Sequence, residues 1–209
     1  MKSVKHNFVL NSLYQILQII VPIITTPYLS RTLGAESIGL YAYNYSIAYY
    51  FSIFILLGLN NYGNRAIATV RDDKNKLSHA FWSIYGMQLL LGIIILTLYF
   101  LYGIYLSKNT TITLLFFPFL ISTVIDINWL FFGLEEFGVT ILRSSFVKIF
   151  STILIFALIK TPSDIEKYCA LMSISMLVSQ IVVWPFLLKR VNKYTPRLIE
   201  ILVLSPEYN

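Results

Sequence analysis

The charged side chains inside the apolar runs of this 209-residue sequence are the groups best suited to chemistry. Asp126 opens the stretch DINWLFFGLEEFG (126–138), and Arg143 and Lys148 lie in the apolar run that follows. A charge in hydrocarbon is costly and marks a functional position by default. Cations that face a cavity suit an anionic headgroup such as a diphosphate, so Arg143 and Lys148 are candidate substrate-binding residues. Arg31 is either a membrane-edge charge or a charge turned inward. Snorkelling to the headgroups is the alternative for cations near a membrane edge.

Asp126 lies seven residues before Gly133, roughly 10 Å inside the run at 1.5 Å per residue. Its short side chain does not reach the headgroups, so we expect it to face the bundle and to pair with a cation such as Lys148. Such a pair is either an ion pair that stabilises helix packing or part of a site that gates or couples transport. Glu135 and Glu136 follow the run and are expected to meet water at the inner surface.

Phenols and an amide form a second group of candidate residues. Tyr41, Tyr45 and Tyr49 are spaced by four and share one helical face, and Asn44 lies beside them. An aromatic belt at the interface explains the outer tyrosines. Asn44, Tyr45 and Tyr49 are candidate cavity residues, because a stripe of phenols facing a wet cavity could stack on sugar rings.

Motifs for catalysis and metal binding are absent from the sequence. It has no HExxH, glycine-rich phosphate loop, G-x-S-x-G or Cys/His pair. His6 and His79 have no ligand at metal-binding spacing, and the single Cys169 excludes an internal disulfide. We therefore expect no metal, no cofactor and no enzyme activity.

The composition indicates a membrane protein. The sequence is 57% hydrophobic and 12% charged, whereas soluble domains are about 25% charged. Six apolar blocks reach the length of a spanning helix. We therefore predict an all-α integral membrane protein with one bundle in residues 1–190 and a cytoplasmic tail at 191–209. The predicted spans are 8–29, 38–59, 80–106, 113–133, 141–160 and 167–188.

The net charge of +6 is a topology signal and does not indicate nucleic-acid binding. With the N-terminus inside, twelve of the 16 Lys and Arg residues fall on inner segments. The four outer ones are Arg31, Lys108, Lys160 and Lys167. Cytoplasmic loops carry the excess of Lys and Arg, so both termini are predicted to be cytoplasmic.

Three spaced motifs resemble the bacterial polysaccharide flippases, the O-antigen and capsule repeat-unit exporters of the multidrug/oligosaccharidyl-lipid/polysaccharide superfamily. They are PYLSRTLG (27–34) with GLY (39–41), then GLNNYGNR (58–65), then DINW (126–129) with GLE (133–135). The resemblance covers residues 1 to about 190. The motif positions are Arg31, Gly34, Asn61, Gly63, Arg65, Asp126, Asn128, Trp129, Gly133 and Glu135.

The resemblance implies a carrier built of two helical bundles that face each other across a cavity. Such a carrier moves an undecaprenyl-diphosphate-linked oligosaccharide across the bacterial cytoplasmic membrane by alternating access, and cavity cations hold the diphosphate. The resemblance thus adds Arg31, a motif position, to Arg143 and Lys148 as candidate substrate-binding residues. Membrane lipid and a lipid-linked oligosaccharide are then the partners, with a polysaccharide polymerase as a further one.

This chain departs from the pattern because it supplies six spans, which make one bundle. We expect either a truncated or frame-shifted product, or a half that pairs with a second six-helix half or with its own copy. Two alternatives to repeat-unit export stay open at this point. They are a drug or cation exporter of the same superfamily and a non-transporting assembly subunit of a polysaccharide synthesis complex.

Overall fold

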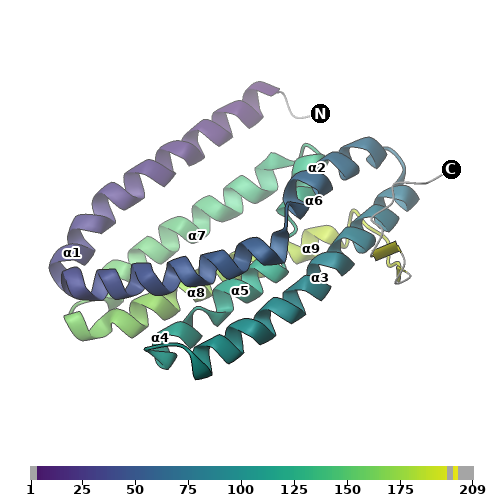
Figure 1. Cartoon of the computed structure of the whole chain (residues 1–209). Coiled ribbons are helices and arrows are strands. Elements are labelled where there is room, and N and C mark those ends of the chain that lie inside the picture. Colours follow the sequence, from purple (N-terminus) through teal and green to yellow (C-terminus); the bar gives the residue numbers. More distant parts are fainter. Residues whose placement is uncertain (1–3, 197–199, 202–209) are drawn as a thin grey trace.

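A computed structural model of the chain describes residues 4–196 and 200–201, with side chains described from residue 11 onward except at 137 and 139. The described part consists of helices joined by short turns, without a strand (Figure 1). The prediction of an all-α fold is confirmed. Residues 1–3, 197–199 and 202–209, which include Lys2, Arg197 and much of the predicted tail, lie outside the described residues.

The first two predicted spans are the two arms of α1 (Val4–Leu56), and the chain reverses direction between them at one residue (Figure 1). Gly34 has φ 81° and ψ 165°, in a region open essentially only to glycine. The residues on either side of Gly34 are helical. The expected turn is therefore a sharp kink instead of a loop.

The segment between the predicted spans at 38–59 and 80–106 is largely helical. Gly58 has φ 80° and precedes α2 (Leu59–Val70), which buries Leu59, Gly63 and Ile67. Helix α3 (Lys74–Tyr105) starts earlier than the predicted span at 80–106. Its N-cap Asp73 accepts hydrogen bonds from the backbone N–H groups of Asn75 and Lys76 at 2.9 and 3.1 Å.

The predicted span at 113–133 corresponds to the candidate membrane-spanning segment Thr110–Gly133, but its helix is interrupted twice. This run is divided into α4 (Thr110–Leu115), α5 (Phe117–Val124) and α6 (Asn128–Gly133). Pro118 at the start of α5 lacks an N–H for the preceding turn. The second break, at 125–127, contains Asp126, and side chains of neighbouring helices bind its backbone carbonyls.

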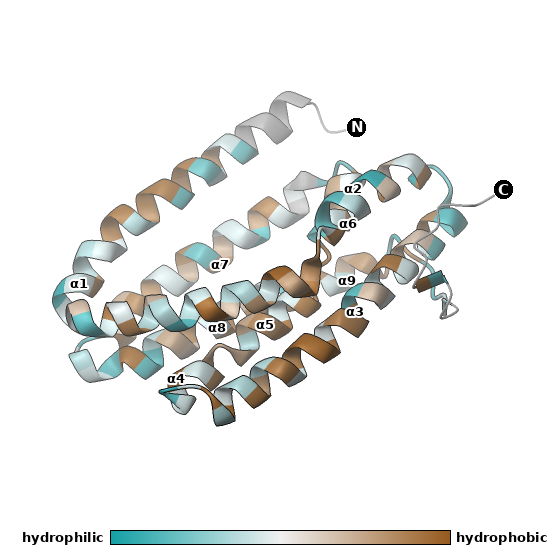
Figure 2. Ribbon diagram, in the orientation of Figure 1, coloured by the Kyte–Doolittle hydropathy of each residue, from teal (hydrophilic) through white to brown (hydrophobic). Residues whose placement is uncertain are grey.

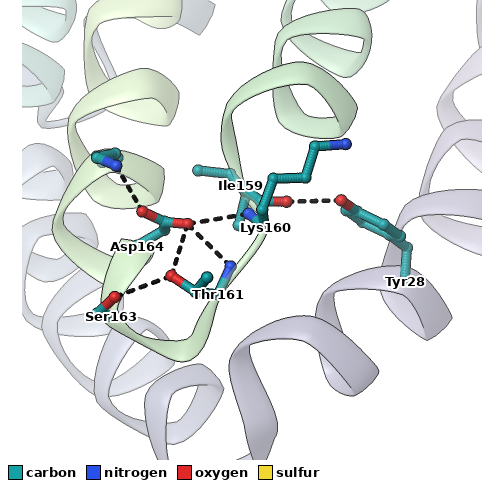
Figure 3. Close-up of polar contacts among 7 residues, drawn as sticks. Tyr28, Ile159, Lys160, Thr161, Ser163 and Asp164 are labelled. Atoms are coloured by element: carbon teal, nitrogen blue, oxygen red, sulfur yellow. Dashed lines mark hydrogen bonds and ion pairs between the residues drawn. The ribbon is translucent and has the colours of Figure 1, made fainter.

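The last part of the bundle comprises α7 (Phe137–Leu158), a 3₁₀ turn (Pro162–Asp164), α8 (Ile165–Ile181) and α9 (Trp184–Leu187). The buried Asp164 carboxylate holds the turn before α8 (Figure 3). It accepts hydrogen bonds from the Lys160 and Thr161 N–H groups at 2.9 Å each and pairs with Lys167 at 2.6 Å. Tyr28 on the first arm of α1 donates to the Ile159 carbonyl at 2.6 Å and ties that arm to the same turn (Figure 3).

Two large hydrophobic clusters lie one after the other along the bundle. The first joins α2, α6 and α9 to the start of α3, and includes Phe81, Trp129 and Phe131. The second joins the second arm of α1 with α4, α5 and the end of α3, and includes Tyr99 and Phe116. The break between α5 and α6 falls between the two clusters.

Five helical segments are long and apolar enough to cross a membrane, and the first of them, Asn11–Val70, contains the reversal at Gly34. Apolar residues predominate along α3 and the arms of α1, while hydrophilic residues gather around α2 and the α1 reversal (Figure 2). The chain is therefore a multi-pass membrane protein.

Candidate functional site

The break between α5 and α6 places a carboxylate inside the bundle. Asp126 Oδ1 accepts a hydrogen bond from the Asn128 N–H at 2.8 Å, at the first residue of α6. An N–H at a helix start has no partner within its own helix, and a carboxylate is a favourable acceptor there. Asp126 thus stabilises the start of α6.

Gln88 on α3 holds this break from the other side. Its side chain is fully buried, and its Nε2 donates to the carbonyls of Thr123, Val124 and Asp126 at 3.0, 3.1 and 2.8 Å. Its Oε1 accepts from the indole N–H of Trp129 at 3.1 Å. The sequence interpretation missed Gln88, although an isolated amide in the middle of an apolar run was a usable signal.

Among the described residues Asp126 forms no ion pair, so the expected pair with Lys148 is not made, and the cation that binds next to Asp126, at Asn128, is Arg143 on α7. Nη2 of Arg143 donates to Asn128 Oδ1 and Ser144 Oγ at 3.1 Å each, and Nη1 donates to Gln180 Oε1 at 3.1 Å. Arg143 and Asp126 are not in direct contact as an ion pair. The Arg143 guanidinium instead links α7 to α6 and α8 at the level of the break.

Lys148 differs from Arg143 in its surroundings. It lies five residues further along α7 and is half-buried. In the described part of the chain its ammonium group has no hydrogen-bond or ion-pair partner, whereas its backbone carbonyl accepts from Ser151 and Thr152. Three proton donors of Lys148 inside an apolar segment are therefore available to an anion.

Arg31 is not brought together with these residues. It is exposed and lies three residues before the reversal at Gly34. The reversal is at the opposite end of the bundle from α6 (Figure 1). The structure therefore groups Asp126, Asn128 and Arg143, with Lys148 further along α7, and leaves Arg31 apart from them.

The tyrosine stripe is mainly a packing surface. The rings of Tyr41 and Tyr45 stack at 5.8 Å, and those of Tyr45 and Tyr49 at 6.2 Å. Tyr41 and Tyr45 also contact Phe116 at 5.5 and 6.1 Å. Tyr49 is 50% exposed. Of these three tyrosines, Tyr49 is the one whose ring is most open to a ligand.

Asn44 also joins helices. Its side chain is buried; Nδ2 donates to the Leu40 carbonyl at 2.9 Å and Oδ1 accepts from Thr113 Oγ1 at 2.8 Å. The hydrogen bond to Thr113 links the second arm of α1 to α4. With both ends of its amide used inside the protein, Asn44 is placed as an interhelical contact.

Two motif glycines allow α2 and α6 to pack closely. A Cβ added to Gly63 would lie 2.7 Å from the Trp129 ring, and one added to Gly133 would lie 2.7 Å from Ile67. Contacts this short are not tolerated in a packed interior. Asn61 and Arg65 lie on the exposed side of α2.

Glu135 and Glu136 lie in the turn after α6 and form ion pairs. Glu135 binds Arg71 at 2.7 Å, and Glu136 binds Arg190 at 2.5 Å. The hydrogen bond that Arg71 donates to the Glu135 carboxylate raises the pKa of Arg71 above its ordinary value. Both carboxylates therefore connect the ends of helices outside the apolar segments.

Comparison with known families accounts for the three motifs. The model of a family described as "Polysaccharide biosynthesis protein" matches residues 4–204. The chain belongs to this family. A similar protein of Escherichia coli (strain K12), named "Putative O-antigen transporter", is 30% identical over 185 residues, which cover 86% of this chain and 44% of that protein. A protein of the same name from Shigella dysenteriae is 28% identical over 196 residues, 91% of this chain and 48% of that protein.

The chain thus spans about half the length of these curated relatives. No solved structure matches it significantly. The family assignment agrees with the resemblance of the three sequence motifs to polysaccharide flippases. The assignment names a family and does not specify one substrate.

Proposed function

We propose that this chain takes part in moving undecaprenyl-diphosphate-linked oligosaccharide repeat units across the bacterial cytoplasmic membrane. The observation that carries the proposal is the Lys148 ammonium group, which lies half-buried in the apolar helix α7 without a partner in the described part of the chain. A diphosphate supplies the acceptors that this group lacks. The family of the chain and the names of its relatives support the same substrate class.

Arg143 has a supporting role in this proposal. Nη1 and Nη2 of its guanidinium already donate to Gln180, Asn128 and Ser144, so Arg143 mainly adds positive charge on the same helix as Lys148. Tyr49, with its exposed ring, is the tyrosine best placed to stack on a sugar. Lys148 is therefore the residue assigned to the diphosphate.

The proposed topology has six membrane crossings with both ends in the cytoplasm. The reversal at Gly34 divides the first of the five candidate spans into two crossings. Helix α1 begins and α9 ends at the same end of the bundle (Figure 1). That end carries Arg71, Lys74, Lys76, Lys189, Arg190 and Lys193, in the manner of a cytoplasmic side.

Transport requires a second bundle in this proposal, since the relatives are about twice as long as the matched region. The partner is a further six-helix half or a second copy of the chain. A polysaccharide polymerase would take over the exported repeat units. Export of drugs or cations is less well supported, because the Asp126 carboxylate is already engaged by the Asn128 N–H at the start of α6.

The binding of undecaprenyl diphosphate to the chain in lipid nanodiscs tests the proposal. Hydrogen bonds to charged groups contribute about 1.5–3 kcal/mol, so Lys148→Ala should weaken binding roughly 10- to 100-fold. Lys148→Arg should retain most of the affinity. Lys160→Ala, which removes an exposed cation after α7, is the matched control and should bind like the wild type. Equal affinity of the Lys148→Ala variant and the wild type would refute the assignment.

The cellular test uses a strain that lacks the gene. Lipid-linked repeat units should accumulate on the inner leaflet and surface polysaccharide should fall. The wild-type gene and Lys160→Ala should restore export, and Lys148→Ala should not. Normal surface polysaccharide in the deletion strain would contradict the proposed function.

A further inference from the structure

Gln88 is a buried polar residue that the proposed function does not use directly. Its amide has two N–H donors and an oxygen, and both ends are engaged. The nitrogen lies within 3.1 Å of the three carbonyls of Thr123, Val124 and Asp126, and the oxygen accepts from Trp129. Because no polar atom of Gln88 remains free, its role lies in holding the backbone and not in binding a ligand.

The carbonyls that Gln88 binds need hydrogen-bond donors because the helix is interrupted there. An unsatisfied carbonyl is unfavourable in an apolar interior, where no water is present to donate a hydrogen bond. The fourth carbonyl of the segment, that of Ile125, accepts from the Trp184 indole at 3.1 Å. Gln88 and Trp184 together satisfy the break and fix its geometry.

A close approach on α3 supports this role. One turn after Gln88, a Cβ added to Gly92 would lie 2.7 Å from Val124. Residues four apart lie on one helical face, so Gln88 and Gly92 present a single surface to the end of α5. Gly92 thus allows α3 to approach the end of α5 closely, and the Gln88 amide forms hydrogen bonds to the break.

The hydrogen bonds of Gln88 lie on both sides of Asn128. One reaches the Asp126 carbonyl before it, and another reaches the Trp129 side chain after it. Asn128 in turn accepts from Arg143 Nη2 at 3.1 Å. We infer that Gln88 is a positioning residue that fixes Asn128. Asn128 in turn holds the Arg143 guanidinium, and this anchor sets the rotation of α7. That rotation presents Lys148 to the substrate diphosphate.

This inference rests on the proposed function for its substrate, but it makes a structural claim of its own. A helix is rigid over five residues, so the anchoring of Arg143 determines the direction in which Lys148 points. Loss of the Gln88 amide should therefore change the surroundings of Lys148 even when no lipid is bound.

The decisive variant is Gln88→Met, which has a similar length and no hydrogen-bonding amide. The matched control is Tyr99→Phe on the same helix, because Tyr99 is fully buried and donates to the Thr113 carbonyl at 2.8 Å, away from the break. Gln88→Met loses the four hydrogen bonds of the Gln88 amide, and Tyr99→Phe loses one buried hydrogen bond from α3 to the same interrupted segment. Gln88→Met should therefore lower the melting temperature in nanodiscs more than Tyr99→Phe, and both readouts are taken on folded protein.

The first readout is binding of undecaprenyl diphosphate. Gln88→Met should weaken it roughly tenfold, the lower end of the effect of a hydrogen bond to a charged group, and Tyr99→Phe should leave it within about twofold. In an Arg143→Gln background, Gln88→Met should have no further effect on affinity, because the residue it acts through is gone. The same loss in both backgrounds would overturn the inference.

The second readout needs no lipid ligand. The rate at which a water-soluble maleimide modifies Lys148→Cys should change severalfold when Gln88→Met is added and stay constant when Tyr99→Phe is added. If the Gln88→Met protein does not fold, Asn128→Ala replaces it and should give the same change. An unchanged rate in a folded variant would refute the positioning role. Failure of the wild type to bind the lipid, with the rate change present, would refute only the proposed substrate.

Discussion

Gly63 lies where α2 packs too closely on α6 to leave room for a side chain. In Gly63→Ala the new Cβ would sit 2.7 and 2.8 Å from Cε3 and Cδ2 of the Trp129 ring. The ring cannot move aside, because it is 1% exposed and its N–H is bound to Gln88. Overpacking of this kind costs about 1–3 kcal/mol. The higher helix propensity of alanine relative to glycine opposes this cost and stabilises the variant by about 1 kcal/mol.

The control Gly39→Ala separates the two effects. Gly39 is also helical, and an added Cβ there meets nothing within 4 Å. Gly39→Ala should therefore be stabilising, and the difference in unfolding free energy between the two variants should equal the overpacking cost of about 1–3 kcal/mol. Titration with SDS in mixed micelles, followed by tryptophan fluorescence, measures this difference. The reasoning is refuted if Gly63→Ala is as stable as Gly39→Ala.

Four further substitutions test other features of the structure. Gly34→Ala should lower unfolding free energy by roughly 1–3 kcal/mol, because the φ of 81° and ψ of 165° strain any other residue; thermal melting checks this. Asp164→Ala should cost about 1–2 kcal/mol by the same assay, as the loss of a helix cap does. Arg71→Ala should cost less than about 1 kcal/mol in the same titration, because its ion pair with Glu135 is exposed. Asp126→Asn keeps an acceptor for the α6 start but removes the negative charge near the cations, so undecaprenyl diphosphate should bind more tightly in nanodiscs; weaker binding by a folded variant would contradict this.

The helical bundle could be predicted from the sequence because apolar runs long enough to span a bilayer have few other solutions. The runs do not show where a helix is interrupted. The break at 125–127 lies in a run that reads as continuous, and it exists because Gln88 and Trp184, distant in sequence, bind its carbonyls. Tertiary hydrogen bonds of this kind have no periodic signature in the sequence.

The candidate site was predicted in part. The depth of Asp126, Arg143 and Lys148 in their runs predicted them as intramembrane charges, but spacing alone did not show that Asp126 would bind a backbone N–H in place of Lys148. The break rotates and displaces the chain after Asp126, and Arg143 is the residue that reaches Asn128. Asn44 was expected to face a cavity, yet Thr113 on α4 engages it, a contact between residues 69 apart.

The two hydrophobic clusters have a consequence for the order of unfolding. A layer of hydrogen-bonded amides and carbonyls separates them, and α3 contributes to both, through Phe81 at one end and Tyr99 at the other. Cooperative units that open separately show distinct amide exchange rates. The end of the bundle that contains α2, α6 and α9 should therefore exchange its amide protons as one unit, and the end that contains α4 and α5 as another.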